Sequence, residues 1–377
     1  MQKQGFMKVG PVPLSFPGTR GLVVLGNKSG ETTEPQGDAA KDHVTRTYAS
    51  DLLLYQNTFT NRARLTSATT TEAQDKNIFT LRANKGRFIY WSNNTTYGGS
   101  TMLGAVAGGT ADPSIRVQHV VIESNRFIQD PRDSTGLNRD SHLGRLEFNT
   151  TGNSAGTNPV ANVMLRNNYF ENPRGLSKPE NPNAPRERGY VITGPTERVY
   201  FLHNTFVHKQ NEDRSSTPNI LNKPWLRLRR QLNGAASLNV FRGNLIVSQQ
   251  AAAPSSNTQR IMDIDDTTSQ AQAGNGLFMA GQVLDNVFPA APSSTAYVFR
   301  FAGTERAFMG TSGAPSWGNI FSDDEQLSIT LDGTYKPTTS NIDNAVRVNS
   351  FFGLIADLYG TLRPDNTDTL TKGAVQR

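Results

Sequence analysis

Apolar and polar residues alternate in short runs along most of this chain, with the two-residue period of a β-strand. In VMLRNNYFENP (163–173), the inward-type residues Val163 and Leu165 alternate with neighbours of the opposite face, and the run then ends on asparagines. Asparagine is depleted in strands but favoured at turns, because it tolerates left-handed backbone and hydrogen-bonds nearby main chain. The run therefore predicts a strand that ends at a corner.

The same phrase recurs along the chain, and its copies lie roughly 40 residues apart. The copies are YQNTFTN (55–61), ESNRFIQ (123–129), RNNYFEN (166–172), LHNTFVH (202–208), RGNLIVS (242–248), LDNVFPA (284–290) and WGNIFSD (317–323). Their corner asparagines are Asn57, Asn125, Asn168, Asn204, Asn244, Asn286 and Asn319. The long gap after the first copy contains Asn93-Asn94, which we interpret as a further corner. An internal repeat of this length indicates stacked structural units.

A second alternating run precedes each copy, for example GRLEFNT, RGYVITG, PWLRLRR, QRIMDID, AYVFRFA before WGNIF, and LSITLDG (327–333) before VNSFF. Helical periodicity and two-residue Asn-Gly hairpin turns are nearly absent, so neither βαβ units nor hairpins are favoured. The sequence predicts an all-β fold, a single-stranded right-handed parallel β-helix of about nine coils over residues 21–377, preceded by a cap segment over residues 1–20.

Stacked corners explain the recurring asparagine and aromatic residues. Amides at equivalent corners can hydrogen-bond from coil to coil, while an aromatic residue two positions later stacks inside. The residues expected to stack are Phe59, Phe127, Phe170 and Phe206. We expect Asn204 to contribute more to stability than Asn244, whose copy of the phrase is degraded.

The corner phrases and the C-terminal sequence DLYGTLRPDNTDTLTKGAVQR (357–377) resemble bacterial right-handed β-helix proteins of the pectate-lyase-like class. Such proteins often close with a D-x-x-G-x-x-R-P…G-A phrase, matched here by Asp357, Gly360, Arg363, Pro364, Gly373 and Ala374. The resemblance covers most of the chain and implies the fold. It does not choose among lyases, hydrolases, tailspikes and adhesins, which share this scaffold.

Alternation on the leading strands predicts one outward face that carries arginines, acids and a tryptophan. An exposed tryptophan can stack on a sugar ring, and arginines can bind carboxylate or sulfate groups. The expected substrate-binding residues are Trp225, Arg227, Arg145, Arg82 and Arg300. Ordinary cross-strand ion pairs between Arg227 or Arg229 and Asp263 or Asp265 are the alternative interpretation.

Catalysis on this face would use Arg229, Glu147, Asp263 and Asp265. The segment is similar in outline to the chondroitinase and alginate-lyase family, whose L-x-L-R element is matched by Leu226, Leu228 and Arg229. The family's acidic calcium pair and lysine base are not matched in RGYVITGPTERVYF (188–201). A glycoside hydrolase would instead use a carboxylate pair. Asp263 and Asp265 could form such a pair or hold calcium; we expect no other cofactor or metal site.

The composition of the chain excludes only a few classes of binding partner. The chain has no cysteine and a net charge of +6, no apolar run long enough to span a membrane, and no apolar core in MQKQGFMKVGPVPLSF typical of a secretory signal. Helix-turn-helix and RNP motifs are missing, so we do not expect nucleic-acid binding. Two hypotheses remain. One is an extracellular β-helix that binds or cleaves an acidic polysaccharide as a lyase or glycosidase. The other is a non-catalytic structural protein of a cell or virion surface that forms a homotrimer.

Overall fold

The computed structural model describes the chain in segments that contain β-strands, turns and no helix. The described residues are 20–26, 28–29, 35–36, 43–47, 50–60, 64–65, 79–83, 87–97, 100–104, 106–107, 110–111, 117–128, 146–149, 160–172, 190–208, 226–229, 238–248, 259–265, 278–289, 297–301, 304–307, 325–327, 329–338, 357–359, 362 and 373–375. The expected cap over residues 1–20 and the corner at Asn319 lie outside these segments, apart from Arg20 in the first strand.

Most strands belong to one 16-stranded sheet with two branches that meet in β19 (Tyr190–Leu202). The first branch contains β1 (Arg20–Leu25), β5 (Ser50–Tyr55), β9 (Arg87–Ser92), β14 (Gln118–Glu123), β17 (Val160–Arg166), β22 (Asn239–Arg242) and β25 (Phe278–Leu284). The second branch contains β4 (His43–Thr47), β8 (Phe79–Ala83), β11 (Ser100–Gly104), β16 (Leu146–Asn149), β21 (Leu226–Arg229), β24 (Gln259–Asp265), β27 (Tyr297–Phe301) and β28 (Thr304–Ala307).

A second sheet of nine strands follows the corners. It contains β2 (Lys28–Ser29), β6 (Thr58–Thr60), β10 (Thr95–Tyr97), β15 (Arg126–Ile128), β18 (Tyr169–Asn172), β20 (Thr205–His208), β23 (Leu245–Ser248), β26 (Val287–Pro289) and β29 (Glu325–Leu327). Two small pairs complete the described strands: β3 (Pro35–Gln36) with β7 (Arg64–Leu65), and β12 (Val106–Ala107) with β13 (Thr110–Ala111).

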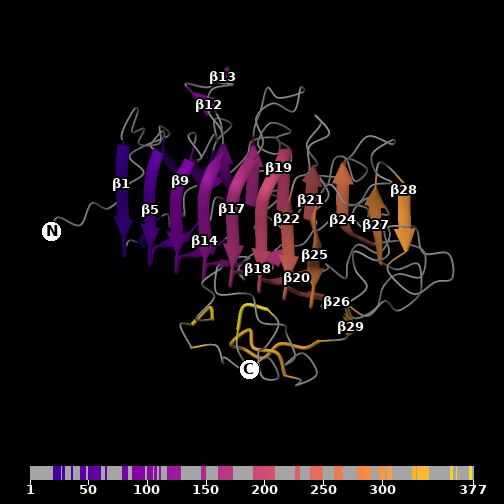
Figure 1. The fold of residues 1–377 in the computed structure, drawn as a ribbon. Helices are drawn as coiled ribbons and strands as arrows, with labels where there is room; N and C mark the ends of the chain where they lie inside the picture. The colour runs from indigo at the N-terminus through magenta and orange to yellow at the C-terminus, as the bar shows by residue number, and fades with distance from the viewer. Residues whose placement is uncertain are drawn as a thin grey trace.

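Neighbouring strands in the two large sheets are parallel, except for the antiparallel pair β27 and β28. The chain passes from the first branch to the nine-stranded sheet and then to the second branch, as β17, β18 and β19 illustrate. Strands of the first branch stand side by side in chain order from indigo to orange (Figure 1). Parallel strands in two sheets without helix fit a β-helix.

Inward side chains of both sheets form the core. Phe170 lies between Phe127 and Phe206, with ring centroids 4.8 and 5.1 Å apart. The expected stack does not extend directly to Phe59, because Thr96 of β10 pairs in register between Phe59 and Phe127. The larger Trp91 fills space there and contacts the edge of the Phe127 ring. The column of phenylalanines is thus interrupted at Thr96, and Trp91 of a neighbouring column packs against Phe127 at that level.

Seven asparagines form a continuous ladder at the corner between the first branch and the nine-stranded sheet. They are Asn57, Asn94, Asn125, Asn168, Asn204, Asn244 and Asn286. Each side-chain oxygen from Asn94 onward accepts the backbone N–H and an amide hydrogen of the preceding asparagine, as Asn204 does from Asn168. The predicted ladder is confirmed, including the copy at Asn94. Asn244 makes the same bonds as Asn204, so its degraded phrase does not weaken the corner.

The left-handed residue of each corner precedes the ladder asparagine. Positive φ occurs at Gln56, Asn93, Ser124, Asn167, His203, Gly243 and Asp285. The ladder asparagines themselves do not adopt it. Asparagine is therefore selected at the ladder position by its amide hydrogen bonds, and the tolerance of left-handed backbone matters one residue earlier.

The C-terminal strap, which comprises residues 329–338, 357–359 and 373–375, covers the outer face of the nine-stranded sheet. One buried cluster contains Ile329, Leu358, Ala374 and Val375 of the strap together with Ile128, Tyr169, Val207, Leu245, Val247 and Val287 of the sheet. Hydrogen bonds fix it: Ala374 donates its N–H to Thr205 Oγ1 and Gly373 donates to the Gly243 carbonyl, both at 2.8 Å. The yellow segment lies beneath the middle of the strand row (Figure 1).

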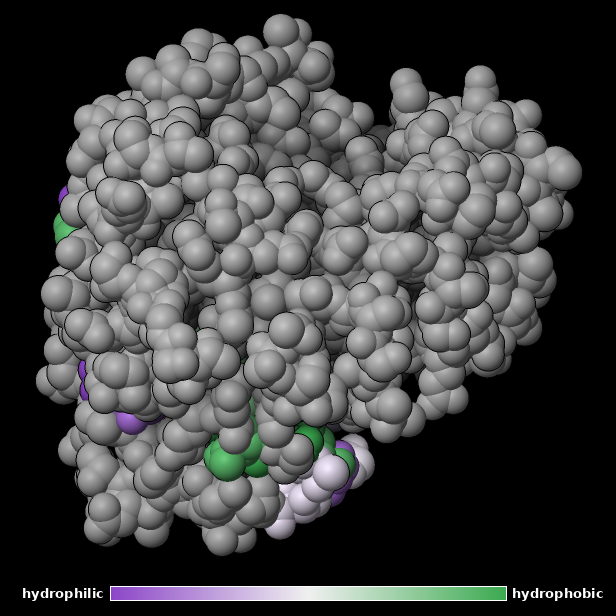
Figure 2. Space-filling view, turned by 90° about the vertical axis from the view of Figure 1, so that its right-hand side faces the viewer, coloured by the Kyte–Doolittle hydropathy of each residue, from purple (hydrophilic) through white to green (hydrophobic). Residues whose placement is uncertain are grey.

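The strap differs from the sequence prediction at LSITLDG (327–333). A strand leading a further coil was expected there, but Leu331 pairs with Pro337 across a tight turn. Asp332 Oδ1 accepts hydrogen bonds from the backbone of Thr334 and Lys336, which closes that turn. On the face seen in Figure 2, the described apolar residues gather at the lower edge, the level of the strap in Figure 1.

Candidate functional site

Strand register in the second branch aligns most of the predicted site residues. Successive partners across eight strands are Arg46, Arg82, Met102, Glu147, Val191, Arg227, Asp263 and Arg300. Arg229 and Asp265 are partners two positions further along β21 and β24. The backbone thus brings seven predicted residues onto two adjacent rows: Arg82, Glu147, Arg227, Asp263, Arg300, Arg229 and Asp265. Trp225 and Arg145 lie outside the described residues.

Charge is distributed unevenly along this row. In the later strands, Arg227, Asp263 and Arg300 alternate in sign at successive positions. In the earlier strands, Arg46 and Arg82 are direct partners, and Met102 rather than an acid follows them. Opposite charges at adjacent register positions favour ion pairs, whereas two adjacent arginines favour an added anion. The binding and catalytic roles of the predicted residues remain predictions.

Side-chain geometry is described for the outer face of the first branch, where the sequence did not predict a site. Tyr90 of β9 donates its hydroxyl hydrogen to Glu123 Oε1, and Arg166 of β17 donates from Nε and a terminal nitrogen to Glu123 Oε2. Burial raises the pKa of Tyr90, and its hydrogen bond to Glu123 raises this pKa further. Both carboxylate oxygens are engaged, so this cluster joins three strands rather than offering a free general base.

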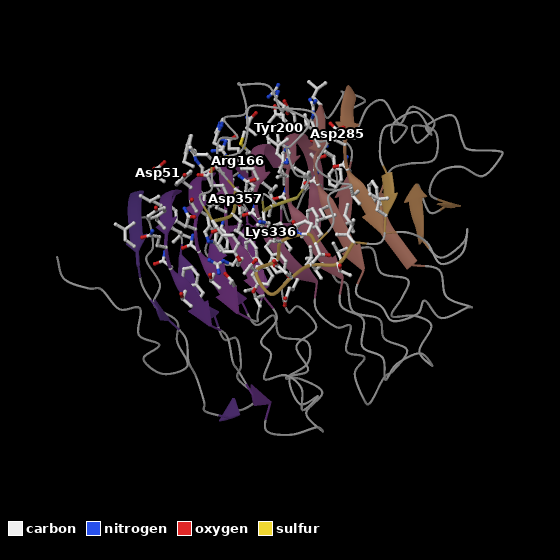
Figure 3. All side chains as sticks on the ribbon, turned by 90° about the horizontal axis from the view of Figure 1, so that it is seen from below. Asp51, Arg166, Tyr200, Asp285, Lys336 and Asp357 are labelled. Carbon is white, nitrogen blue, oxygen red and sulfur yellow. The ribbon has the colours of Figure 1, made fainter. Side chains whose placement is uncertain are left out.

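The cluster continues toward the later strands of the same face. Arg242 Nε lies 3.9 Å from Asp285 Oδ2; burial lowers the pKa of Arg242 and the charge of Asp285 opposes this. Burial also raises the pKa of Tyr200, against the opposing charge of Arg198. Asp51, Arg166, Tyr200 and Asp285 follow one another across the row of strands in Figure 3, with Lys336 and Asp357 of the strap nearer its centre.

An alignment of the corner phrases could have found part of this face. Glu123, Arg166 and Arg242 each stand two residues before a ladder asparagine. Strand register pairs Glu123 with Arg166, and Leu202 lies between Arg166 and Arg242 in the same row. Tyr90 stands four residues before Asn94 and therefore belongs to a different row. The spacing of residues in the sequence does not reveal the contact between Tyr90 and Glu123, because it does not show that a tyrosine side chain reaches the next strand.

A column of left-handed residues borders the same face where the strands begin. Its members are Asp51, Phe88, His119, Asn162, Arg198 and Leu238, with φ between 53° and 59°. Strand pairing skips the column: Gln118 pairs with Arg87 and Val120 with Ile89, leaving Phe88 and His119 out of register pairs. Within the described segments, Arg198 contacts Asn162 Oδ1 at 3.4 Å and Glu197 at 2.7 Å. The first branch thus carries an exposed ridge beside its outer face.

Metal ligands are not concentrated in the described part of the chain. No group of three or more histidine, aspartate or glutamate residues there could hold a metal ion. The side chains of Asp263 and Asp265 are not described, so calcium binding by this pair remains a prediction. His203 occupies the buried corner before Asn204, and a Cβ on Gly243 would lie 2.8 Å from its ring. His203 is therefore packed inside the corner turn.

Comparison with protein-family models, curated proteins and solved structures finds no match. Within the described segments there is also no helix of the length and apolarity needed to cross a bilayer. The function is therefore argued from the arrangement of residues on this chain alone.

Proposed function

We propose that this chain is a right-handed parallel β-helix of about nine coils that binds an acidic extracellular polysaccharide. The parallel sheets and the asparagine ladder support the fold, because a ladder requires equivalent corners to stack at one strand spacing. A polymer suits such a scaffold, since the repeating coils present equivalent positions along one axis.

The observation that carries this proposal is the register of the charged row. Arg82, Arg227 and Arg300 occupy the same row of the second branch, and Arg229 lies two positions from Arg227. Guanidinium groups bind carboxylate and sulfate in bidentate fashion. A row that carries arginine on four of its eight strands can therefore contact an anionic chain at several points, with Trp225 as a stacking platform for one sugar ring.

Chemistry on this face would fall to Arg229, Glu147, Asp263 and Asp265. Elimination needs a base and a cation that neutralises the sugar carboxylate. Hydrolysis needs two carboxyl groups, and positions two apart on one strand are separated by roughly 6–7 Å. A lysine base is not in place on the preceding coil. We therefore propose that binding is the main activity of this face. Cleavage of the bound polymer, as a polysaccharide lyase or glycosidase, is the second activity that we propose for it.

A structural surface protein of a cell or virion, assembled as a homotrimer, is the second candidate. The observation that favours it is the sign alternation of Arg227, Asp263 and Arg300, together with the Arg229 and Asp265 partners. Such a pattern can be satisfied internally by cross-strand ion pairs without any ligand.

A glycan array and a melting curve on three proteins separate the two candidates. For polysaccharide binding, Trp225→Ala and Arg229→Ala should each reduce retention on acidic glycans at least about tenfold while the melting temperature stays nearly constant. The arginine effect should fade with added salt. For the structural candidate, the wild type retains no glycan and Arg229→Ala melts earlier.

A further inference from the structure

The residues Arg87, Phe88 and His119 form a stack at the edge of the first branch. The guanidinium carbon of Arg87 lies 5.1 Å from the centroid of the Phe88 ring. The His119 ring lies parallel to the Phe88 ring, with centroids 5.1 Å apart and an interplanar angle of 9°. An arginine and a histidine from neighbouring strands therefore both lie against one aromatic ring.

Their hydrogen-bonding groups are not used by the rest of the described chain. Among the described residues, neither the Arg87 guanidinium nor the His119 imidazole makes a hydrogen bond or ion pair, and Arg87 Nε is buried without a partner. The Phe88 ring is 43% exposed and His119 is also exposed. Compare Arg166 and Arg198, which are both paired with glutamates. The stack thus presents donors and a positive ring edge to solvent.

The backbone beneath this stack is held in an unfavourable conformation. Phe88 and His119 have φ of 53° and 55°, a region that costs free energy for a residue with a bulky side chain. The fold enforces this conformation along the ridge, because all six members of the left-handed column share it. The conformation displays both rings on the ridge instead of turning them into the sheet.

Two further arginines lie on strands of the second branch, one of them shortly before Arg87 in the sequence. Arg87 follows Arg82 by five positions, and Arg82 is the register partner of Arg46. The nearest acid in the left-handed column is Asp51, on the adjacent strand β5. Asp51 is thus the one acid among the named members of the left-handed column, which otherwise offers no negative charge beside the stack.

We propose that Arg87 and His119, held by Phe88, form a binding site for a carboxylate or sulfate group of an acidic polysaccharide. This inference rests on the proposed function and adds a second contact point at the edge of the first branch. The guanidinium supplies a charge-assisted bond, and the imidazole supplies a second donor on the next strand. Phe88 fixes the spacing between them and positions both groups.

The test measures binding of the full chain to oligogalacturonate, dextran sulfate and neutral dextran. Arg87→Gln should weaken binding of an anionic probe at least about tenfold, and His119→Gln roughly threefold to tenfold. Asp51→Asn should strengthen it, because a nearby negative charge is removed. Arg198→Gln is the matched control, an exposed arginine of the same ridge that already pairs with Glu197, and it should leave affinity unchanged. Stronger binding of oligogalacturonate identifies a carboxylate as the bound group, and stronger binding of dextran sulfate identifies a sulfate.

Binding by the wild type tests the proposed function, and the differences among the variants test the proposed site. If the wild type binds an anionic probe but Arg87→Gln, His119→Gln and Arg198→Gln are indistinguishable, the site is wrong and the proposed function stands. If the wild type binds neither anionic probe, both are wrong. Equal retention of neutral dextran and the anionic probes also overturns the site. Circular dichroism melting of each variant shows whether lost binding reflects lost folding, and a loss that follows melting counts against the site.

Discussion

Asn168 donates one amide hydrogen to Asn204 Oδ1 at 3.0 Å and the other to the Ile122 carbonyl at 2.8 Å. One side chain therefore joins the corner of the next coil to a strand of the preceding coil. The same pair of bonds recurs at Asn204 and Asn244. The ladder is therefore continuous, and its interior asparagines make equivalent hydrogen bonds.

Replacing an interior ladder asparagine should be strongly destabilising. Asn204→Leu removes the acceptor of one Asn168 amide hydrogen and of the Asn168 backbone N–H, and also the amide donor to the Leu165 carbonyl, at about 1–3 kcal/mol for each buried group left unpaired. We expect a loss of at least about 3 kcal/mol in urea unfolding. Asn244→Leu should cost a similar amount, contrary to the sequence-based expectation. A loss below about 1 kcal/mol at both positions would refute this account of the corner.

Gly243 allows left-handed backbone and steric contact to be measured separately. Gly243 and Gly26 have φ of 64° and 60°, but an added Cβ meets the His203 ring at 2.8 Å in the first and nothing within 4 Å in the second. Gly26→Ala should cost about 1–2 kcal/mol from backbone strain alone. Gly243→Ala should cost roughly 2 kcal/mol more, because the buried ring cannot move aside. Equal losses in urea unfolding would mean that the ring adapts freely.

The strap should depend on Thr205 as an acceptor. Thr205→Val keeps the shape of the side chain but leaves the buried Ala374 N–H without its acceptor, at about 1–3 kcal/mol. Thr58→Val is the control, since Thr58 also follows a ladder asparagine and has no hydrogen bond to a described strap residue. Hydrogen exchange should rise at Ala374 in the first variant only. Unchanged protection there would show that packing alone holds the strap.

Tyr90 should make stability fall at alkaline pH. Its pKa is raised in the folded chain by burial and then by Glu123, so the protonated phenol is favoured by folding. This contribution is fully present below the unfolded pKa of about 10 and is lost as pH rises through the higher folded value. Tyr90→Phe should remove that part of the alkaline loss. Glu123→Gln should bring the Tyr90 titration, followed by ultraviolet absorbance difference, to lower pH. A Tyr90 titration unmoved by Glu123→Gln would contradict the contact.

Local repetition explains which features the sequence could predict. The ladder from Asn57 to Asn286 was visible because one chemical requirement recurs at one position per coil. The left-handed residue before it was not assigned, because the bend imposes that conformation on residues as different as Gln56 and His203. In the Asn167-Asn168 pair, the turn preference and the ladder preference fall on adjacent asparagines and look alike in the sequence.

The alternation of apolar and polar residues could not predict contacts between different rows of side chains or between distant segments of the chain. Tyr90 and Glu123 meet only because register places their strands side by side, and loops of unequal length hide that register. The strap was also missed. Val207 and Leu245 are outward apolar residues whose cover comes from residues near the end of the chain. In the second branch, alternation identified aligned charged positions, while spacing alone does not say whether they pair or bind.

The bond between Ala374 and Thr205 spans 169 positions, which sets an order of events during synthesis. Coils can stack one after another as the chain emerges, since each needs only its neighbour. The apolar outer face around Val207 and Leu245 stays uncovered until the strap residues have left the ribosome, and exposed apolar surface of this kind favours aggregation. A nascent chain stalled just short of Gly373 would therefore hold stacked coils and still be a substrate for chaperones until the strap docks on this face.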